Sequence, residues 1–158
     1  EPFKPKDKLG DDFYEKMGEI IGDLLNRSNY EGLKSIGFKK SAFDLEINGL
    51  PKIKNHGKGY RSYLNSIAVM ALSKYINEYG KYKSDLLMID TPLDGLEEGK
   101  ERLPKGMQKG IFKLFMERGE SNQTIVVENL DHLPDIDFEQ NGVNVIRYDN
   151  NQGFLYLD

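Results

Sequence analysis

Two short apolar runs, each ending in a carboxylate, constrain the fold of this chain more than any other feature. The first reads DLLMID and ends at Asp90, and the second reads TIVVEN and ends at Glu128–Asn129. Continuous apolar runs of this length are typical of strands buried on both faces of a parallel sheet. Residues 103–119 between them carry a helical apolar pattern. This order predicts an α/β fold with a parallel central sheet flanked by helices.

The rest of the chain extends this order on both sides. Asp11 and Asp12 are candidate caps of a first helix, and Asn48–Gly49 is a typical hairpin turn. The expected apolar face of this helix consists of Phe13, Met17, Ile20, Ile21, Leu24 and Leu25. Hydrophobic periodicity and turn residues predict these further elements: a helix over 11–27, a strand or hairpin over 41–54, a glycine-rich loop and long helix that stop near Gly80, and a terminal β-hairpin over 142–157.

Composition excludes several classes of protein. The 158 residues suit one domain, the net charge is −4 and cysteine is absent, so no disulfide and no Cys-ligated metal site is expected. No apolar run approaches the roughly 20 residues that cross a bilayer, and no membrane partner is expected. These features predict a cytoplasmic protein. Residues 1–10, with two prolines and several charges, are interpreted as a tether or the cut end of a longer chain.

The strand ends carry the candidate chemistry. Ligands of open α/β sheets bind beyond the carboxyl ends of the strands, so Asp90 and Glu128 are expected to face one crevice if their strands are parallel neighbours. A carboxylate there can hold Mg²⁺ together with phosphate oxygens. The alternative is that Asp90 only caps the turn that Thr91 and Pro92 begin.

A glycine-rich loop, HGKGYRS, precedes the long helix and is the second candidate element. Gly57 and Gly59 allow backbone N–H groups to approach an anion at a helix N-terminus, and Lys58 and Arg61 add positive charge. An ordinary helix entry explains the same residues. The P-loop pattern G-x-x-x-x-G-K-S/T is absent from the chain.

The order of these motifs resembles a known family from about residue 11 to 158. HGKGYRSYLNSIAVMALSKYI is similar to a signature loop and helix, LLMIDTPLDGLEEG to a Walker B strand and D-loop, and TIVVENLDHLP to a switch-loop strand. Together they resemble the C-terminal ATPase lobe of the ABC-type, coiled-coil, DNA-associated ATPases, namely the SMC, RecF and RecN-like proteins. The resemblance implies that 11–30 end a coiled-coil arm and that 31–158 form the lobe.

This resemblance implies ligands, partners and roles. Asp90 would bind Mg²⁺ through water, and Asp94 would act across a dimer interface. Gly57, Lys58 and Gly59 would contact the γ-phosphate of ATP held by a second head, although the family's serine is absent here. The implied partners are an N-terminal P-loop lobe of the same full-length protein, a second head and DNA. The expected work is DNA repair, chromosome organisation or defence against phage.

Two departures from the family pattern bear on catalysis. Thr91 stands where the family has its catalytic Glu, and Glu128–Asn129 stand where it has the switch His. We therefore expect Glu128 to serve as a relocated general base, with Asn129 orienting water or phosphate. The alternative for Glu128 is an exposed strand end or a partner for a lysine. The alternative for the whole chain is a catalytically impaired dimerisation or scaffold module. In either case the isolated chain is predicted to be inactive.

Overall fold

The computed structural model describes residues 8–51, 58–95 and 103–148. Within them lie three α-helices, five strands and a short 3₁₀ helix, a mixed α/β fold. The elements follow in the order α1 (Asp11–Arg27), β1 (Ile36–Lys39), β2 (Asp44–Ile47), β3 (Leu50–Pro51), α3 (Lys58–Tyr79), β4 (Leu86–Asp90), α4 (Lys105–Gly119), β5 (Gln123–Val127) and η2 (Leu130–His132).

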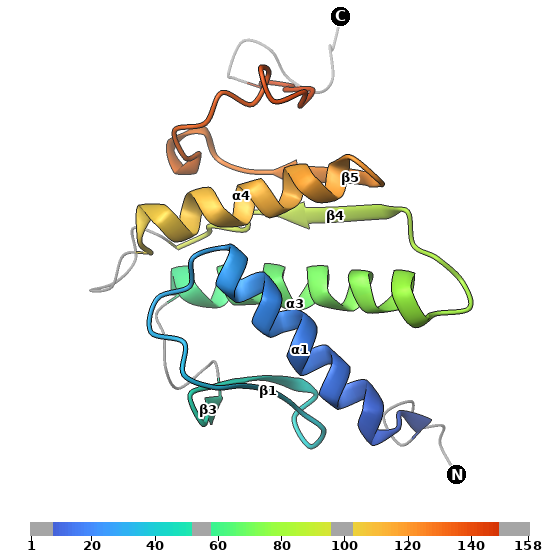
Figure 1. The fold of residues 1–158 in the computed structure, drawn as a ribbon. Coiled ribbons are helices and arrows are strands. Elements are labelled where there is room, and N and C mark those ends of the chain that lie inside the picture. The colour runs from blue at the N-terminus through green and yellow to red at the C-terminus, as the bar shows by residue number, and fades with distance from the viewer. Residues whose placement is uncertain (1–7, 52–57, 96–102, 149–158) are drawn as a thin grey trace, which may run out of the picture.

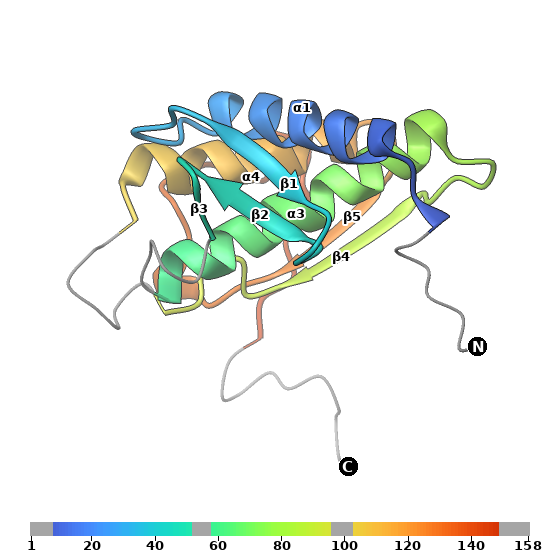
Figure 2. The same ribbon diagram turned by 90° about the horizontal axis from the view of Figure 1, so that it is seen from below.

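The long helix α3 lies in the middle of the molecule (Figures 1 and 2). Helix α1 packs against α3 and β1, while α4 packs against β5 and contacts α1. The predicted apolar face of α1 is buried in full, namely Phe13, Met17, Ile20, Ile21, Leu24 and Leu25. Asp11 and Asp12 occupy its first turn, where negative charge suits the helix dipole, but the N-cap is Gly10 and no side chain caps the helix.

The expected parallel central sheet is present only as a two-stranded pair in the part of the chain that the structure describes. Strands β1, β2 and β3 form an antiparallel sheet in that order, and only β4 and β5 pair in parallel. Connection length explains the difference: short turns join the first three strands, whereas parallel pairing needs a crossover, which α4 supplies between β4 and β5. The predicted turn is confirmed, with positive φ angles of 53° at Asn48 and 78° at Gly49.

Two further expectations changed at the level of single strands. β1 was not predicted, because its sequence is interrupted by Gly37 and the strand forms through its pairing with β2. The first half of the expected terminal hairpin is not a strand: residues 142–148 pair with no described strand. The second half, 149–157, lies outside the described residues.

The described residues cover only one face of the parallel pair β4–β5. Leu87 and Ile89 are buried, 5% and 8% exposed, and β5 packs on α4. The alternate residues remain open, with Leu86 47%, Met88 63%, Ile125 37% and Val127 56% exposed. We call Leu86, Met88, Ile125 and Val127 the open sheet face. The prediction that these strands are buried on both faces is therefore wrong for the described chain.

The three helices meet at a tightly packed junction. Ser28, just past α1, is fully buried, and its hydroxyl forms a hydrogen bond with that of Tyr63 on α3. Burial raises the pKa of Tyr63. Gly110 of α4 lies against the backbone of Ser28, so a Cβ at this position would collide with the Ser28 carbonyl group. We call Ser28, Tyr63 and Gly110 the helix junction.

No helix of the described segments is long and apolar enough to cross a membrane.

Candidate functional site at the strand ends

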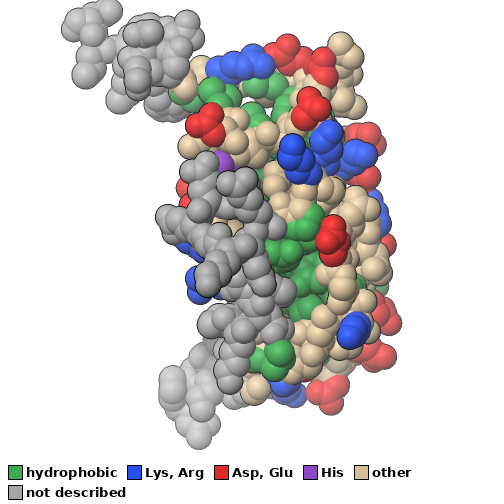
Figure 3. Space-filling view, turned by 90° about the vertical axis from the view of Figure 1, so that its left-hand side faces the viewer, with side chains coloured by type: hydrophobic (Ala, Val, Ile, Leu, Met, Phe, Trp, Pro, Cys, Tyr) green, Lys and Arg blue, Asp and Glu red, His purple; other side chains and the backbone are tan. Residues whose placement is uncertain are grey.

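Four element ends meet at one edge of the molecule. In Figure 1, β4 and β5 point toward the left-hand side, where α3 and α4 begin. The register pairs Asp90 with Val127, and the Thr91 N–H donates to the Val127 carbonyl at 2.8 Å. Asp90 and Glu128 therefore follow neighbouring strands at the same edge. Seen from this side, hydrophobic side chains lie between charged ones in the part that is not grey (Figure 3).

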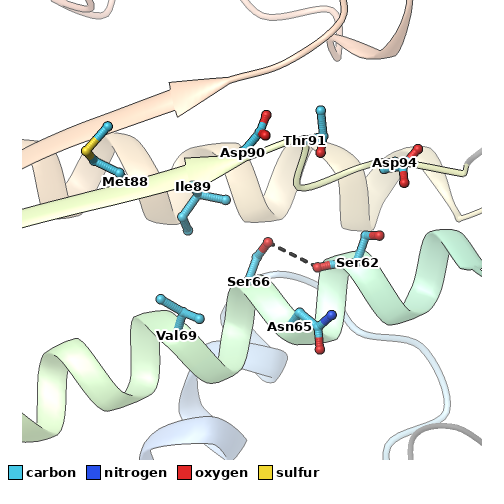
Figure 4. A pocket seen from close by; sticks show the side chains of 9 residues that line it. All are labelled: Ser62, Asn65, Ser66, Val69, Met88, Ile89, Asp90, Thr91 and Asp94. Atoms are coloured by element: carbon cyan, nitrogen blue, oxygen red, sulfur yellow. Dashed lines mark hydrogen bonds between the residues drawn. The ribbon is translucent and has the colours of Figure 1, made fainter.

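Asp90 is exposed and borders an open cleft of about 250 Å³. The cleft lies between β4 and the first half of α3, where Ser62 and Ser66 point toward the strand (Figure 4). The Asp90 carboxylate points away from α3, on the side of β4 that carries Met88. This carboxylate is accessible to a ligand from the open sheet face.

The loop after β4, Thr91–Gly95, has a strained start and buried anchors. Thr91 has a φ of 47°, which is rare for a β-branched residue. The Asp94 N–H donates to the Thr91 carbonyl at 3.0 Å and closes a tight turn. Pro92 and Leu93 are buried, and Gly95, with a φ of 78°, lies against the Lys58 side chain. We call Thr91–Gly95 the strand-end loop.

The glycine-rich helix start lies beside this loop. Lys58, the first residue of α3, places its Nζ 3.4 Å from Oδ2 of Asp94, and both side chains are close to half exposed. Gly59 is buried and Arg61 is exposed. Gly57 lies outside the described residues. The structure thus brings together two of the motifs, the helix start and the acidic loop.

Glu128 is neither an exposed strand end nor the partner of a lysine in the described chain. Its side chain is 2% exposed. Oε2 accepts the Leu93 N–H at 2.9 Å, and Oε1 accepts the Asn129 N–H at 2.8 Å. Nδ1 of His132, in η2, lies 3.2 Å from Oε1. Both carboxylate oxygens are therefore engaged, and the role of Glu128 as a general base stays a prediction.

Asn129 has a local role in the structure. Its side-chain oxygen accepts the Asp131 N–H at 3.2 Å and caps η2. The residue is exposed, so its predicted task of orienting water or phosphate also stays a prediction. Sequence reasoning missed Leu93 and His132, the partners of Glu128. An apolar pair, Pro92 and Leu93, inside an otherwise acidic loop was the available signal that this loop is anchored in the core.

The described segments hold no group of three or more His, Asp or Glu side chains placed to bind a metal ion. Mg²⁺ commonly takes one or two carboxylates and completes its shell with phosphate oxygens and water. Asp90 can therefore act as the ligand from this chain when a nucleotide supplies the others.

Comparison with known proteins does not assign the chain to a family. No protein-family model matches it, and no curated protein matches it.

Proposed function

We propose that this chain is the C-terminal lobe of a composite ATPase head, which binds Mg²⁺–ATP between itself, a P-loop lobe elsewhere in the same protein and a second head. The observation that carries the proposal is the meeting of Asp90, the strand-end loop and the start of α3 at one edge. These are the Walker B, D-loop and signature elements of the resemblance. DNA as a partner rests on the resemblance alone.

The charges at this edge support nucleotide binding. Asp90 offers an exposed carboxylate for Mg²⁺, and the amino ends of α3 and α4 direct their positive dipole ends to the same side. Lys58 and Arg61 add positive charge at the start of α3. This arrangement suits a polyphosphate with its divalent cation. The carboxylate can bind the cation, and the positive groups on the same surface can bind the phosphates.

The open sheet face supports the proposal that another lobe packs against this chain. Its four apolar side chains lie on β4, which carries Asp90, and on β5, and Val127 is paired directly with Asp90. β5 has no partner on its outer edge among the described strands. A contiguous exposed apolar surface marks a site where another structural unit packs. The chain has no P-loop of its own, so the lobe that carries the P-loop has to lie close to Asp90. The open sheet face offers this lobe an apolar surface to pack against.

The test uses the complete protein that carries G-x-x-x-x-G-K-S/T and measures nucleotide affinity with and without Mg²⁺. We expect Asp90→Ala to weaken the Mg²⁺-dependent affinity by about tenfold or more and to leave the fold intact, because the residue is exposed. Asp85→Ala, an exposed aspartate at the other end of the same strand, is the control and leaves the affinity unchanged. Unfolding of Asp90→Ala with retained metal dependence would instead make Asp90 a structural cap. ATP turnover by the isolated 158-residue chain, above a contaminant control, would overturn the composite head.

A second candidate is a head of the same fold that dimerises without hydrolysis. Thr91 in the place of a carboxylate and the engaged oxygens of Glu128 favour it. Nucleotide-dependent dimers of the complete protein with no turnover above background would select this candidate over the ATPase.

A further inference from the structure

We propose that Glu128 is a positioning residue that fastens the strand-end loop to the end of β5 and thereby sets the surface presented to a second head. The proposal rests on the proposed function and deepens it. It assigns to Glu128 a task that requires no proton transfer.

The contacts of Glu128 join two segments that are far apart in the sequence. Its Oε2 accepts the N–H of Leu93, 35 residues earlier, and its Oε1 accepts the N–H of its neighbour Asn129. His132 closes the far side of the carboxylate and is itself only 17% exposed. A buried carboxylate is retained when hydrogen bonds satisfy its oxygens, and here each oxygen has a backbone donor.

The fastened loop needs such a restraint. The loop leaves β4 through Thr91, and the positive φ of Thr91 is a backbone conformation that β-branched residues rarely adopt. A strained start persists only when surrounding contacts over-determine it. The Thr91 N–H bond to Val127, the Leu93 N–H bond to Glu128 and the burial of Pro92 and Leu93 supply those contacts.

The restraint ends at the surface that would meet a partner. Asp94 directly follows Leu93, and its carboxylate lies 3.4 Å from Nζ of Lys58 at the start of α3. Displacement of the Leu93 backbone therefore displaces Asp94 relative to Lys58. Glu128, although buried, controls how these two exposed charges are presented.

This role and the role of a general base predict opposite results for Glu128→Gln. If Glu128 is the base, the variant keeps ATP binding, loses about 10²-fold in turnover and accumulates dimerised heads. If Glu128 positions the loop, the carboxamide has to place its NH₂ group against the Leu93 N–H or the Asn129 N–H, and this loss of one acceptor loosens the loop. The variant then forms fewer nucleotide-dependent dimers.

The first measurement is residue-resolved amide hydrogen exchange by NMR on the chain without nucleotide. We expect the Leu93 amide to exchange about tenfold faster or more in Glu128→Gln, relative to the Ile21 amide of α1, which reports global unfolding. Glu128→Asp, one methylene shorter, also releases Leu93 while it keeps the charge. Glu139→Gln, an exposed glutamate paired with Arg147, is the control and changes neither amide. Unchanged protection of Leu93 in Glu128→Gln would overturn the proposal.

The second measurement is the fraction of dimer formed by the complete protein with ATP and Mg²⁺. We expect a severalfold smaller fraction in Glu128→Gln and Glu128→Asp, and no change in Glu139→Gln. Accumulation of dimers in Glu128→Gln would overturn the positioning role and support the base. If the wild-type protein forms no nucleotide-dependent dimers while Leu93 is released as expected, the proposed function fails and the fastening of the loop stands.

Discussion

The helix junction and the edge of the molecule where β4 and β5 end differ in how completely their side chains are packed. At the junction, Ser28 and Tyr63 are fully buried and satisfied by each other, and Gly110 lets α4 approach the backbone without a gap. At the edge, the parallel strands leave apolar side chains exposed, and Thr91 adopts a strained backbone conformation. One region is complete within the described chain, and the other is not.

The difference separates stability from function in this molecule. Close packing and satisfied polar groups at the junction stabilise the fold. The edge gains little from its exposed apolar residues, and the strain at Thr91 persists because local hydrogen bonds and the burial of Pro92 and Leu93 hold the loop. Substitutions at the two regions are therefore expected to differ in what they change.

The largest contrast is expected within β4. Ile89→Ala removes a buried side chain that packs in the core, and it should lower the free energy of unfolding by about 3 kcal/mol. Met88→Ala, the neighbouring residue on the open sheet face, should cost less than about 0.5 kcal/mol. Urea unfolding of both variants measures the difference. Equal losses would show that the open sheet face is covered and would remove the contrast between the two regions.

A smaller effect is expected at Gly110. Gly110→Ala places a methyl group against the Ser28 backbone, at a cost of about 3 kcal/mol, while alanine regains about 1 kcal/mol of helix propensity. The net loss is about 2 kcal/mol. Gly106→Ala in the same helix meets no atom within 4 Å and should not destabilise. Thermal or urea unfolding of this matched pair tests whether the junction is as tight as the contacts indicate.

The smallest effect is expected at Tyr63. Tyr63→Phe removes the hydrogen bond to Ser28 and should cost about 1 kcal/mol at neutral pH. Because burial raises the pKa of Tyr63 above its ordinary value of 10, the unfolded chain releases this proton first as the pH rises. The free energy of unfolding should then fall above about pH 10, by up to about 1.4 kcal/mol per pH unit.

Comparison of variants isolates this pH effect. Tyr63→Phe should lack the Tyr63 part of the decline, whereas Tyr79→Phe, at a half-exposed position, should retain it. Parallel declines in Tyr63→Phe and wild type would contradict the buried hydroxyl.

Helices and turns were predicted well because they depend mainly on the type and spacing of residues that are neighbours in the sequence. The apolar spacing of α1 reports a helix with one buried face, and all six of its predicted residues are buried. Asn48–Gly49 specifies its turn through the positive φ angles that both residues tolerate. The meeting of Asp90 and Glu128 at one edge also followed from the sequence, because α4 between β4 and β5 makes parallel neighbours the expected arrangement.

Long-range contacts account for what the sequence did not predict. β1 exists because β2 pairs with it, and its own residues give a weak signal. The burial of Glu128 depends on the Leu93 amide and on His132, and no local pattern places these groups together. Whether β4 and β5 are covered on both faces depends on the elements that pack against them, and the exposure of Leu86 and Met88 between buried Leu87 and Ile89 is visible only in the structure.

The open sheet face also has a consequence for biosynthesis. During translation, the open sheet face and the edge of β5 that no described strand covers are available as soon as the strands form. Such an edge pairs readily with strands of other chains, and apolar surface beside it favours aggregation. Production of this segment alone should therefore yield soluble protein mainly at low expression rates. If the proposed P-loop lobe covers the face, co-expression with it raises the yield, and a charged residue in place of Met88 should raise it without a partner.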